Sequence, residues 1–518
     1  MKKNIVICAD GTGNTTIKGR GTNVFKLYEA VDQIGHRYKP GLTPQVALYH
    51  DGVGTESVKW LRLLTGATGW GLSRNVKQLY GELARVYAPG DKIFLFGFSR
   101  GAFTVRTLAG LINACGILDL SKYKTNAAFD LGVGDAYAEY RKQYNSWLTS
   151  LFHRTRKLDA ARVAELRRQF SVRIPEFESG AKGKLIEFMG VWDTVDAVGL
   201  PVRAADFVNR AIYNFKFPDR TLNTSVAHAC HALALDEERE SFKPVLWNES
   251  ATTEPERIEQ VWFAGVHSNV GGGYPRQGMS LVALEWIMAK AEAAPHNLRF
   301  IADEREMLRF HADVDDKLYD SRAGLGVFYR WLPRNPSRLC ADNGVAAKVH
   351  RSVYERIARN TEGYAPGSVP PEAEVISLSQ GSQVTDAVRG LVRTQHGKGG
   401  PLLEREAGTE RLGRWSYWLF VWGIVIAGLL VLREFLAAAM LGTGSWREVG
   451  HNLAGTIVSS QWLVLIFEVL WRNPWLVAWQ VLTLAIAMWV DKRLDARYSD
   501  FWHRDQLRLR LRQALGLG

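Results

Sequence analysis

The chain has 518 residues, of which 47% are hydrophobic and 23% charged, and its formal net charge is +12. This length exceeds one compact core, so we expect roughly two or three folding units. The basic residues accompany apolar segments rather than a nucleic-acid-binding module, which argues against nucleic acid as a partner and favours a membrane. The four cysteines are far apart and form no CxxC pair, so neither a disulfide framework nor a zinc cluster is expected.

The N-terminal segment carries two lysines and then an apolar run over residues 4–9 that stops at Asp10. This run is too short for the hydrophobic region of a signal peptide, so we predict a buried strand and no export by a cleaved signal. The strand leads into the turn Asp10-Gly11-Thr12-Gly13-Asn14, whose glycines allow backbone N–H groups to face a ligand. A plain tight turn is the alternative.

Strands and helices alternate in the next hundred residues. Apolar runs at 46–49 and 92–98 predict strands, whereas residues 72–86 and 102–114 predict helices. This alternation predicts a mostly parallel sheet flanked by helices, the architecture of an α/β fold. Residues 119–183 are instead rich in Tyr, Lys, Arg and Glu and predict a helical insert, with a lid as a candidate role.

The pentapeptide Gly97-Phe98-Ser99-Arg100-Gly101 lies between a predicted strand and a predicted helix and fits the pattern G-x-S-x-G. Small residues two before and two after the serine let the strand and the helix pass closely. Such a turn holds the serine hydroxyl at the carboxyl end of the strand. Ser99 is therefore the predicted nucleophile, and a structural Gly/Ser-rich turn is the alternative.

A serine nucleophile needs a histidine base that is itself oriented by an acid. The apolar run at 184–192 predicts a strand, and Asp193 follows at its carboxyl end, where the acid of an α/β-hydrolase belongs. We predict Asp193 as the acid and keep Asp196, three residues into the loop, as the reserve. Capping of the next helix is the alternative role for Asp193.

The predicted base is His267, which ends a strand at 261–266 and begins a glycine-rich loop. A histidine in this position can reach back to Ser99. Residues 226–235 are expected to form a helix, and a longer helix is expected at 279–293. Three other histidines are rivals for the role of the base. His228 and His231 lie on the first of these expected helices, where a structural or pocket-lining role is expected, and His50 precedes the serine in the chain.

Acyl transfer at Ser99 also requires hydrogen-bond donors for the developing oxyanion. The backbone N–H of Arg100, directly after the nucleophile, is the first predicted donor. The second is expected from Gly11 or Thr12, with the side chain of Asp10 orienting that turn or the triad. No metal and no other cofactor is expected.

The C-terminal part contains two long apolar runs. Residues 415–432 carry no charge, and a helix of this length nearly crosses the ~30 Å hydrocarbon layer of a membrane. A second uncharged run covers residues 475–490 and can be lengthened backwards through 462–470. Tryptophans near the ends of both runs and basic residues outside them are typical of interfacial anchors.

These features predict a C-terminal α-helical transmembrane hairpin. Both basic flanks are expected in the cytoplasm by the positive-inside rule. The expected organisation is a catalytic domain at 1–395, a linker at 396–414, a membrane region at 415–490 and a basic cytoplasmic tail helix at 491–518. A buried helical hairpin or an amphipathic pair lying in the interface is the alternative.

Four ordered motifs resemble the uncharacterised α/β-hydrolase domain family, which includes the catalytic domains of type VI secretion phospholipase effectors. They are the turn at 10–14, the elbow at 97–102, Gly190-Val191-Trp192-Asp193-Thr194-Val195 and His267-Ser268-Asn269-Val270-Gly271-Gly272-Gly273-Tyr274. The resemblance covers roughly residues 1–370.

This resemblance implies esterase or lipase chemistry, with phospholipid substrates in the effector branch, and it implies Ser99, Asp193 and His267 as the triad. One residue departs from the pattern, because the family usually has Asp after His-Ser where this chain has Asn269. An amide cannot be the anionic member of a triad, which favours Asp193.

The expected function is that of a membrane-anchored serine hydrolase, in the bacterial inner membrane with its catalytic domain in the cytoplasm. Its partners would be membrane lipid and an ester substrate, cleaved through an acyl-enzyme. A phosphatase of the haloacid dehalogenase kind would need an aspartate where this chain has Cys8. A non-catalytic membrane adaptor on a hydrolase scaffold, for example in interbacterial competition or defence, is the other alternative, and the complete candidate triad argues against it.

Overall fold

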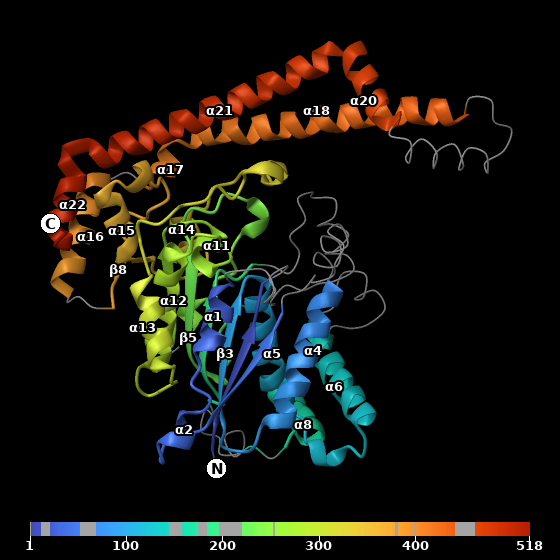
Figure 1. Cartoon of the computed structure of the whole chain (residues 1–518), viewed down its shortest axis with the longest axis vertical. Helices are drawn as coiled ribbons and strands as arrows, with labels where there is room; N and C mark the ends of the chain where they lie inside the picture. The colour runs from blue at the N-terminus through green and yellow to red at the C-terminus, as the bar shows by residue number, and fades with distance from the viewer. Residues whose placement is uncertain are drawn as a thin grey trace.

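In the computed structural model of the chain, helices flank one large sheet and a long helical hairpin extends from it (Figure 1). The structure describes residues 2–11, 21–51, 69–144, 158–172, 174, 184–195, 220–251, 254–378, 382–397, 400–440 and 461–517.

The eight described strands form a single sheet in the order β2-β1-β3-β4-β5-β6-β7-β8, and every neighbouring pair is parallel. Their bounds are β1 Asn4–Ala9, β2 Gln45–His50, β3 Lys92–Phe98, β4 Ile186–Trp192, β5 Val226–Ala234, β6 Ile258–Phe263, β7 Lys348–His350 and β8 Glu374–Ile376. All carboxyl ends therefore lie at one edge of the sheet. This arrangement confirms the predicted α/β class.

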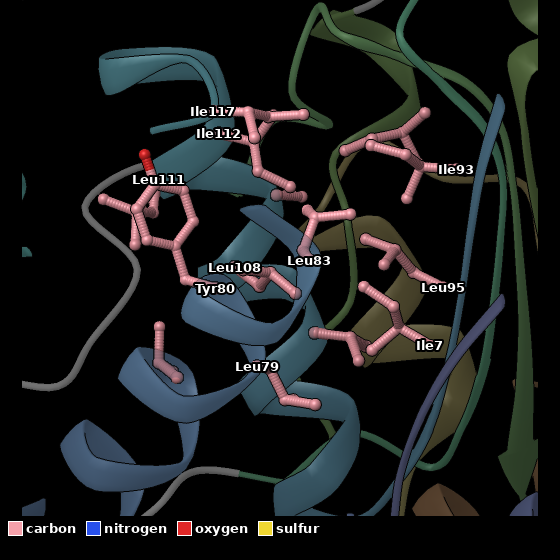
Figure 2. Packing of buried hydrophobic residues seen from close by; sticks show 14 of the residues in the cluster. Ile7, Leu79, Tyr80, Leu83, Ile93, Leu95, Leu108, Leu111, Ile112 and Ile117 are labelled. Atoms are coloured by element: carbon pink, nitrogen blue, oxygen red, sulfur yellow. The ribbon is translucent and has the colours of Figure 1, made fainter. Parts of the chain in front are cut away.

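Each central strand is buried on both faces, which explains its continuous apolar sequence. On one face, Ile7 and Leu95 pack against α4 (Gly69–Val86) and α5 (Arg100–Cys115), as Figure 2 shows. On the other face, alternate residues of the same strands pack against α1 (Asn23–Ala30) and α12 (Gly278–Glu292). The sheet is thus the middle layer of three.

The described part of the predicted insert contains α6 (Asn126–Arg141) and α8 (Ala160–Phe170). Both helices pack against the C-terminal half of α5. A Cβ on Gly110 would meet the hydroxyl of Tyr140 at 2.4 Å, and Arg167 donates to the backbone oxygen of Asn113. These helices extend the core around the C-terminal half of α5, and the rest of the predicted insert lies largely outside the described residues.

The helix expected at 226–235 is wrong, because these residues form β5 between the parallel strands β4 and β6. Alanine is a strong helix former, which is why the composition of this segment favours a helix. Its position between two hydrogen-bonding strands overrides that local preference. His267 also departs from the expected loop, since it is the first residue of the short helix α11 (His267–Gly271).

The hairpin consists of α18 (Ala407–Met440), α20 (Gln461–Arg472) and α21 (Pro474–His503). Along the hairpin, the side chains of Trp479 and Gln480 donate to backbone oxygens of α18. Two stretches, Ala407–Glu434 and Pro474–Leu515, contain windows long and apolar enough to cross a membrane, and only 17% of each window is buried. The helices have the length and composition of membrane spans.

The last described helix, α22 (Leu507–Leu515), packs back onto the rest of the protein beside α15 (Arg351–Arg359) and α16 (Ser382–His396). The boundary predicted at residue 490 falls inside α21. The predicted linker at 396–414 contains α17 (Leu402–Arg405) and the first turns of α18. Residues 491–515 therefore contribute to a packed core, which includes Phe501, Trp502, Leu507, Leu511 and Leu515.

Candidate active site

Ser99 occupies the sharp turn between β3 and α5, with backbone angles of φ 57° and ψ −121°. A Cβ on Gly97 would lie 2.7 Å from the backbone of Ala102, and one on Gly101 would lie 2.1 Å from the backbone oxygen of Ala9. Both positions therefore require glycine for the strand and helix to pass. The turn presents the Ser99 side chain at the carboxyl edge of the sheet.

The structure brings together the three residues predicted as a triad. His267 Nε2 lies 2.8 Å from Ser99 Oγ, and His267 Nδ1 lies 2.5 Å from Asp193 Oδ2. Asp193 directly follows β4 and is fully buried, whereas Ser99 and His267 are 7% and 4% exposed. The hydrogen bonds run in the order that a serine, a base and an acid require.

Arg334 completes the surroundings of Asp193, and the sequence contains no motif that points to it. Its terminal nitrogens lie 2.7 and 2.9 Å from the two oxygens of Asp193, which also accepts from the backbone N–H of Ala234. Burial acts to raise the pKa of Asp193, but the Arg334 guanidinium and His267 outweigh it and hold this pKa well below its usual range. Asp193 is therefore kept ionised.

His267 lies in an apolar setting with charged groups behind it. The rings of Phe98 and Phe242 are centred 4.6 and 4.9 Å from the imidazole. Burial lowers the pKa of His267, and Asp193 opposes this effect only in part. The imidazole is consequently held in its neutral form, which is the form that can accept a proton from Ser99.

The pH profile of kcat/KM is expected to reflect this lowered pKa. A free histidine titrates at about 6.5, and burial disfavours the imidazolium, so the acidic limb should have its midpoint below about pH 6.5. Initial rates with p-nitrophenyl butyrate, measured from about pH 4.5 to 8, would locate the limb. A midpoint above the ordinary histidine value would contradict this expectation.

Asp10 directly follows β1 and is buried. Its carboxylate accepts from the hydroxyls of Thr22 and Tyr49, both at 2.7 Å, and from the N–H of Gly11 at 2.6 Å. The Gly11 amide is thus occupied by Asp10 rather than free for an oxyanion, which departs from the predicted role. The Arg100 amide lies at the start of α5. Thr12 and Asp196 lie outside the described residues.

The rival histidines are engaged elsewhere. His231 is fully buried, and burial lowers its pKa to about 3, so the ring is neutral. Its Nε2 accepts from the N–H of Thr194 at 3.0 Å and so anchors the residue that follows Asp193. His50 Nε2 lies 2.9 Å from Oε1 of Gln78. Asn269 anchors the segment after His267, since it donates to the backbone oxygen of Lys317 at 3.0 Å.

Among the residues that the structure describes, one group of side chains offers metal-ligand atoms: those of His228, Cys230 and Glu259 lie within 4.8 Å of one another. This group is near the amino ends of β5 and β6, opposite the edge that carries Ser99. Its members already have partners, because His228 pairs with His296 at 3.0 Å and Glu259 with the amine of Lys290 at 2.6 Å. The lysine cation disfavours a metal there, and we assign none.

The parallel sheet with helices on both faces and a serine at a strand–helix turn defines an α/β protein with a hydrolase-like site. The family model described as "T6SS, Phospholipase effector Tle1-like, catalytic domain" matches residues 3–290, more than half of the chain. The chain belongs to this family, as the resemblance of its motifs predicts. The match supports lipid hydrolysis at the level of the family.

Two individual proteins are also similar. "Uncharacterized protein YEL023C" from Saccharomyces cerevisiae is 28% identical over 255 residues, which are 46% of this chain and 32% of that protein. The match thus covers about a third of the length of that relative. A crystal structure of an uncharacterized protein from Pseudomonas aeruginosa is 17% identical, with a TM-score of 0.32, and the match covers 75% of this chain and 58% of that one.

Proposed function

We propose that the protein is a membrane-anchored serine hydrolase that cleaves the acyl esters of lipids, phospholipids included. The single observation that carries this proposal is the continuous hydrogen-bonded line from Ser99 Oγ through His267 to Asp193. The line lies where a strand–helix turn exposes a nucleophile in α/β-hydrolases. Lipid as the substrate class follows from the family, whose description names phospholipase effectors.

In the proposed mechanism, Ser99 Oγ attacks the ester carbonyl carbon while His267 Nε2 takes the hydroxyl proton. Asp193 stabilises the imidazolium, and the N–H of Arg100 donates to the oxyanion. Collapse of the tetrahedral intermediate releases the alcohol, which takes the proton from His267, and leaves an acyl-enzyme on Ser99. Water, deprotonated by His267, then attacks the acyl-enzyme and releases the fatty acid.

Aromatic rings near the base support an apolar substrate. Phe98 and Phe242 border His267, and Tyr329 extends the row, since its ring centre lies 5.7 Å from that of Phe242. Phe98 is buried, whereas the partly exposed rings of Phe242 and Tyr329 favour an acyl chain over a polar acid, because the transfer of hydrocarbon from water to an apolar surface is favourable.

Release of fatty acid from phospholipid vesicles tests the proposal. The full-length protein is incubated with mixed-lipid vesicles, and mass spectrometry identifies the products. The wild type should release free fatty acid and the corresponding lysolipid, whereas the Ser99→Ala variant should not. A folded wild type that neither releases fatty acid nor reacts with a fluorophosphonate probe would favour the adaptor alternative.

We further propose that α18 and α21 form a transmembrane hairpin, with the catalytic part on the cytoplasmic side of a bacterial inner membrane. Large apolar side chains on both helices are exposed, among them Trp422, Leu429, Val481 and Leu482. Basic residues flank the apolar segments on the side of the catalytic part: Arg411, Arg414, Lys492 and Arg493. Lipid would cover the apolar surface of the two helices, and the basic residues at their ends would lie on the cytoplasmic side of the membrane.

Membrane fractionation tests the hairpin. The wild type should remain in carbonate-washed membranes, whereas a double variant, Leu429→Arg with Leu482→Arg, should leave them. Each arginine at the centre of a span costs about 2.5–3.5 kcal/mol in insertion. Leu412→Arg is the matched control, since Leu412 is exposed on α18 outside the apolar run. Extraction of the wild type by carbonate would contradict the proposal.

A further inference from the structure

We propose that Arg334 is a positioning residue for the catalytic acid. We propose also that the segment carrying Arg334 couples the rate of hydrolysis to the position of the hairpin relative to the α/β part. This segment, residues 329–334, is called the strap below. The inference rests on the proposed function, because it takes Asp193 as the residue that orients His267. Arg334 lies beyond residues 3–290, which match the family.

The strap is held beside the residues that follow β5. The N–H of Glu240 donates to the backbone oxygen of Arg330 at 3.0 Å, and the N–H of Leu332 donates to that of Glu238 at 2.7 Å. A bridge between Arg239 and Trp331 makes this pairing antiparallel. The backbone of the strap is therefore fixed in register with a segment that begins at the edge of the sheet.

One end of the strap determines the orientation of Asp193. The guanidinium of Arg334 binds both carboxylate oxygens and also donates to the backbone oxygen of Ala234 at 2.6 Å. Arg334 is only 5% exposed. A planar guanidinium with two parallel hydrogen bonds fixes the plane of a carboxylate, which the single ammonium of a lysine does not. The oxygen that faces His267 is thus placed by Arg334.

The other part of the strap rests on the hairpin. Trp331 is buried in a small cluster with Val490 and Leu494 of α21. A Cβ on Gly413 of α18 would lie 2.6 Å from the ring of Trp331, so this ring fills the space that the glycine leaves. The Arg330 guanidinium lies 5.6 Å from the ring centre of Trp418. Both hairpin helices therefore contact the strap close to one end of their apolar runs, which is the start of the run in α18 and the end of the run in α21.

The charge of Arg334 also acts on His267. The charged groups that act on this imidazole are Asp193 after β4 and Glu237 and Arg239 after β5, whereas Arg334 acts on it through its contact with Asp193. Arg334 neutralises much of the Asp193 charge and so limits the stabilisation of the imidazolium. Loss of this cation should leave a stronger anion beside His267, which favours protonation of the base.

The first test compares Arg334→Met and Arg334→Lys with Arg338→Met in the full-length protein, using p-nitrophenyl butyrate. Arg338 is an exposed arginine that follows Arg334 in the chain and lies in α14 (Pro336–Ala341). For Arg334→Met we expect kcat to fall on the order of 10²-fold with KM little changed, and the acidic limb to move up by about one pH unit. Arg334→Lys should keep the acidic limb of the pH profile at the wild-type pH. Arg338→Met should match the wild type in kcat, in KM and in the position of the acidic limb.

Chemical rescue separates positioning from a loss of folding. Added guanidinium ion should restore part of kcat to Arg334→Ala and nothing to Ser99→Ala. An Arg334→Met variant with an unchanged kcat and acidic limb, or no rescue of Arg334→Ala, would overturn the inference. If the wild type itself neither hydrolyses the ester nor reacts with a fluorophosphonate at Ser99, the proposed function fails instead.

The second test moves the strap from the hairpin side. Gly413→Leu places atoms where Trp331 lies, whereas Gly408→Leu on the same helix meets nothing within 4 Å at its Cβ. Both changes replace a glycine of α18 by leucine. We expect Gly413→Leu to lower kcat severalfold although it touches no triad residue, and Gly408→Leu to leave kcat unchanged. Equal kcat values for the two variants would overturn the link between hairpin and acid.

Discussion

Ser99→Ala is expected to lower kcat for ester hydrolysis by on the order of 10⁶-fold, because no acyl-enzyme can form without the hydroxyl. Alanine has no nucleophilic atom, while the oxyanion donor and the substrate-binding surface remain. The measurement is the initial rate with a short acyl ester, together with labelling by a fluorophosphonate probe. Labelling should disappear with the activity.

The matched control is Ser121→Ala, since Ser121 is an exposed serine whose hydroxyl bonds only locally to Asp119 among the described residues. It should retain full activity and full labelling. Thermal unfolding of Ser99→Ala should resemble that of the wild type, because the methyl group fits within the space of the hydroxymethyl group. Strong labelling of the Ser99→Ala protein would assign the nucleophile to another residue.

Asp193→Asn should have the second largest effect, a loss in kcat on the order of 10⁴-fold. The amide cannot stabilise the imidazolium and can hold His267 in the wrong tautomer. It also leaves the buried guanidinium of Arg334 facing a neutral group, and breaking a buried ion pair costs about 3–5 kcal/mol. Kinetics and urea unfolding of the same preparation would measure both losses.

Asp196→Asn is the control for this prediction, because Asp196 is the reserve acid of the sequence. It should retain much of the activity and the stability. The contact between Asp193 and Arg334 is the reason why Asp193→Asn should lower stability as well as activity. Full activity in Asp193→Asn would remove Asp193 from the proposed mechanism.

The parts of the site that the sequence predicts are those set by local rules. Ser99 follows from a strand, a tight glycine-flanked turn and a helix, all within one short segment. Asp193 and His267 follow from the rule that parallel strands bring their carboxyl ends to one edge, so polar residues directly after apolar runs meet there. Each inference needs only the residues next to a strand.

Arg334 could not be predicted in this way. It is separated from Asp193 by 141 positions, follows no strand of the sheet and belongs to no motif. The strap is placed by backbone pairing with residues 237–240 and by contact with the hairpin, which are long-range contacts without periodicity. The error at β5 has a related cause, because an alanine-rich segment forms a strand only when neighbouring strands lie on both sides.

The docking of α22 on α15 and α16 has a consequence for biosynthesis. Apolar residues of those two helices, such as Ile357 and Val388, share their core with Trp502 and Leu511, which are translated only after the hairpin. While the ribosome is still producing the hairpin, that side of the α/β part has no cover. Completion of this packed core is therefore delayed until the hairpin has been translated, so this side of the α/β part and the hairpin reach their final packing together.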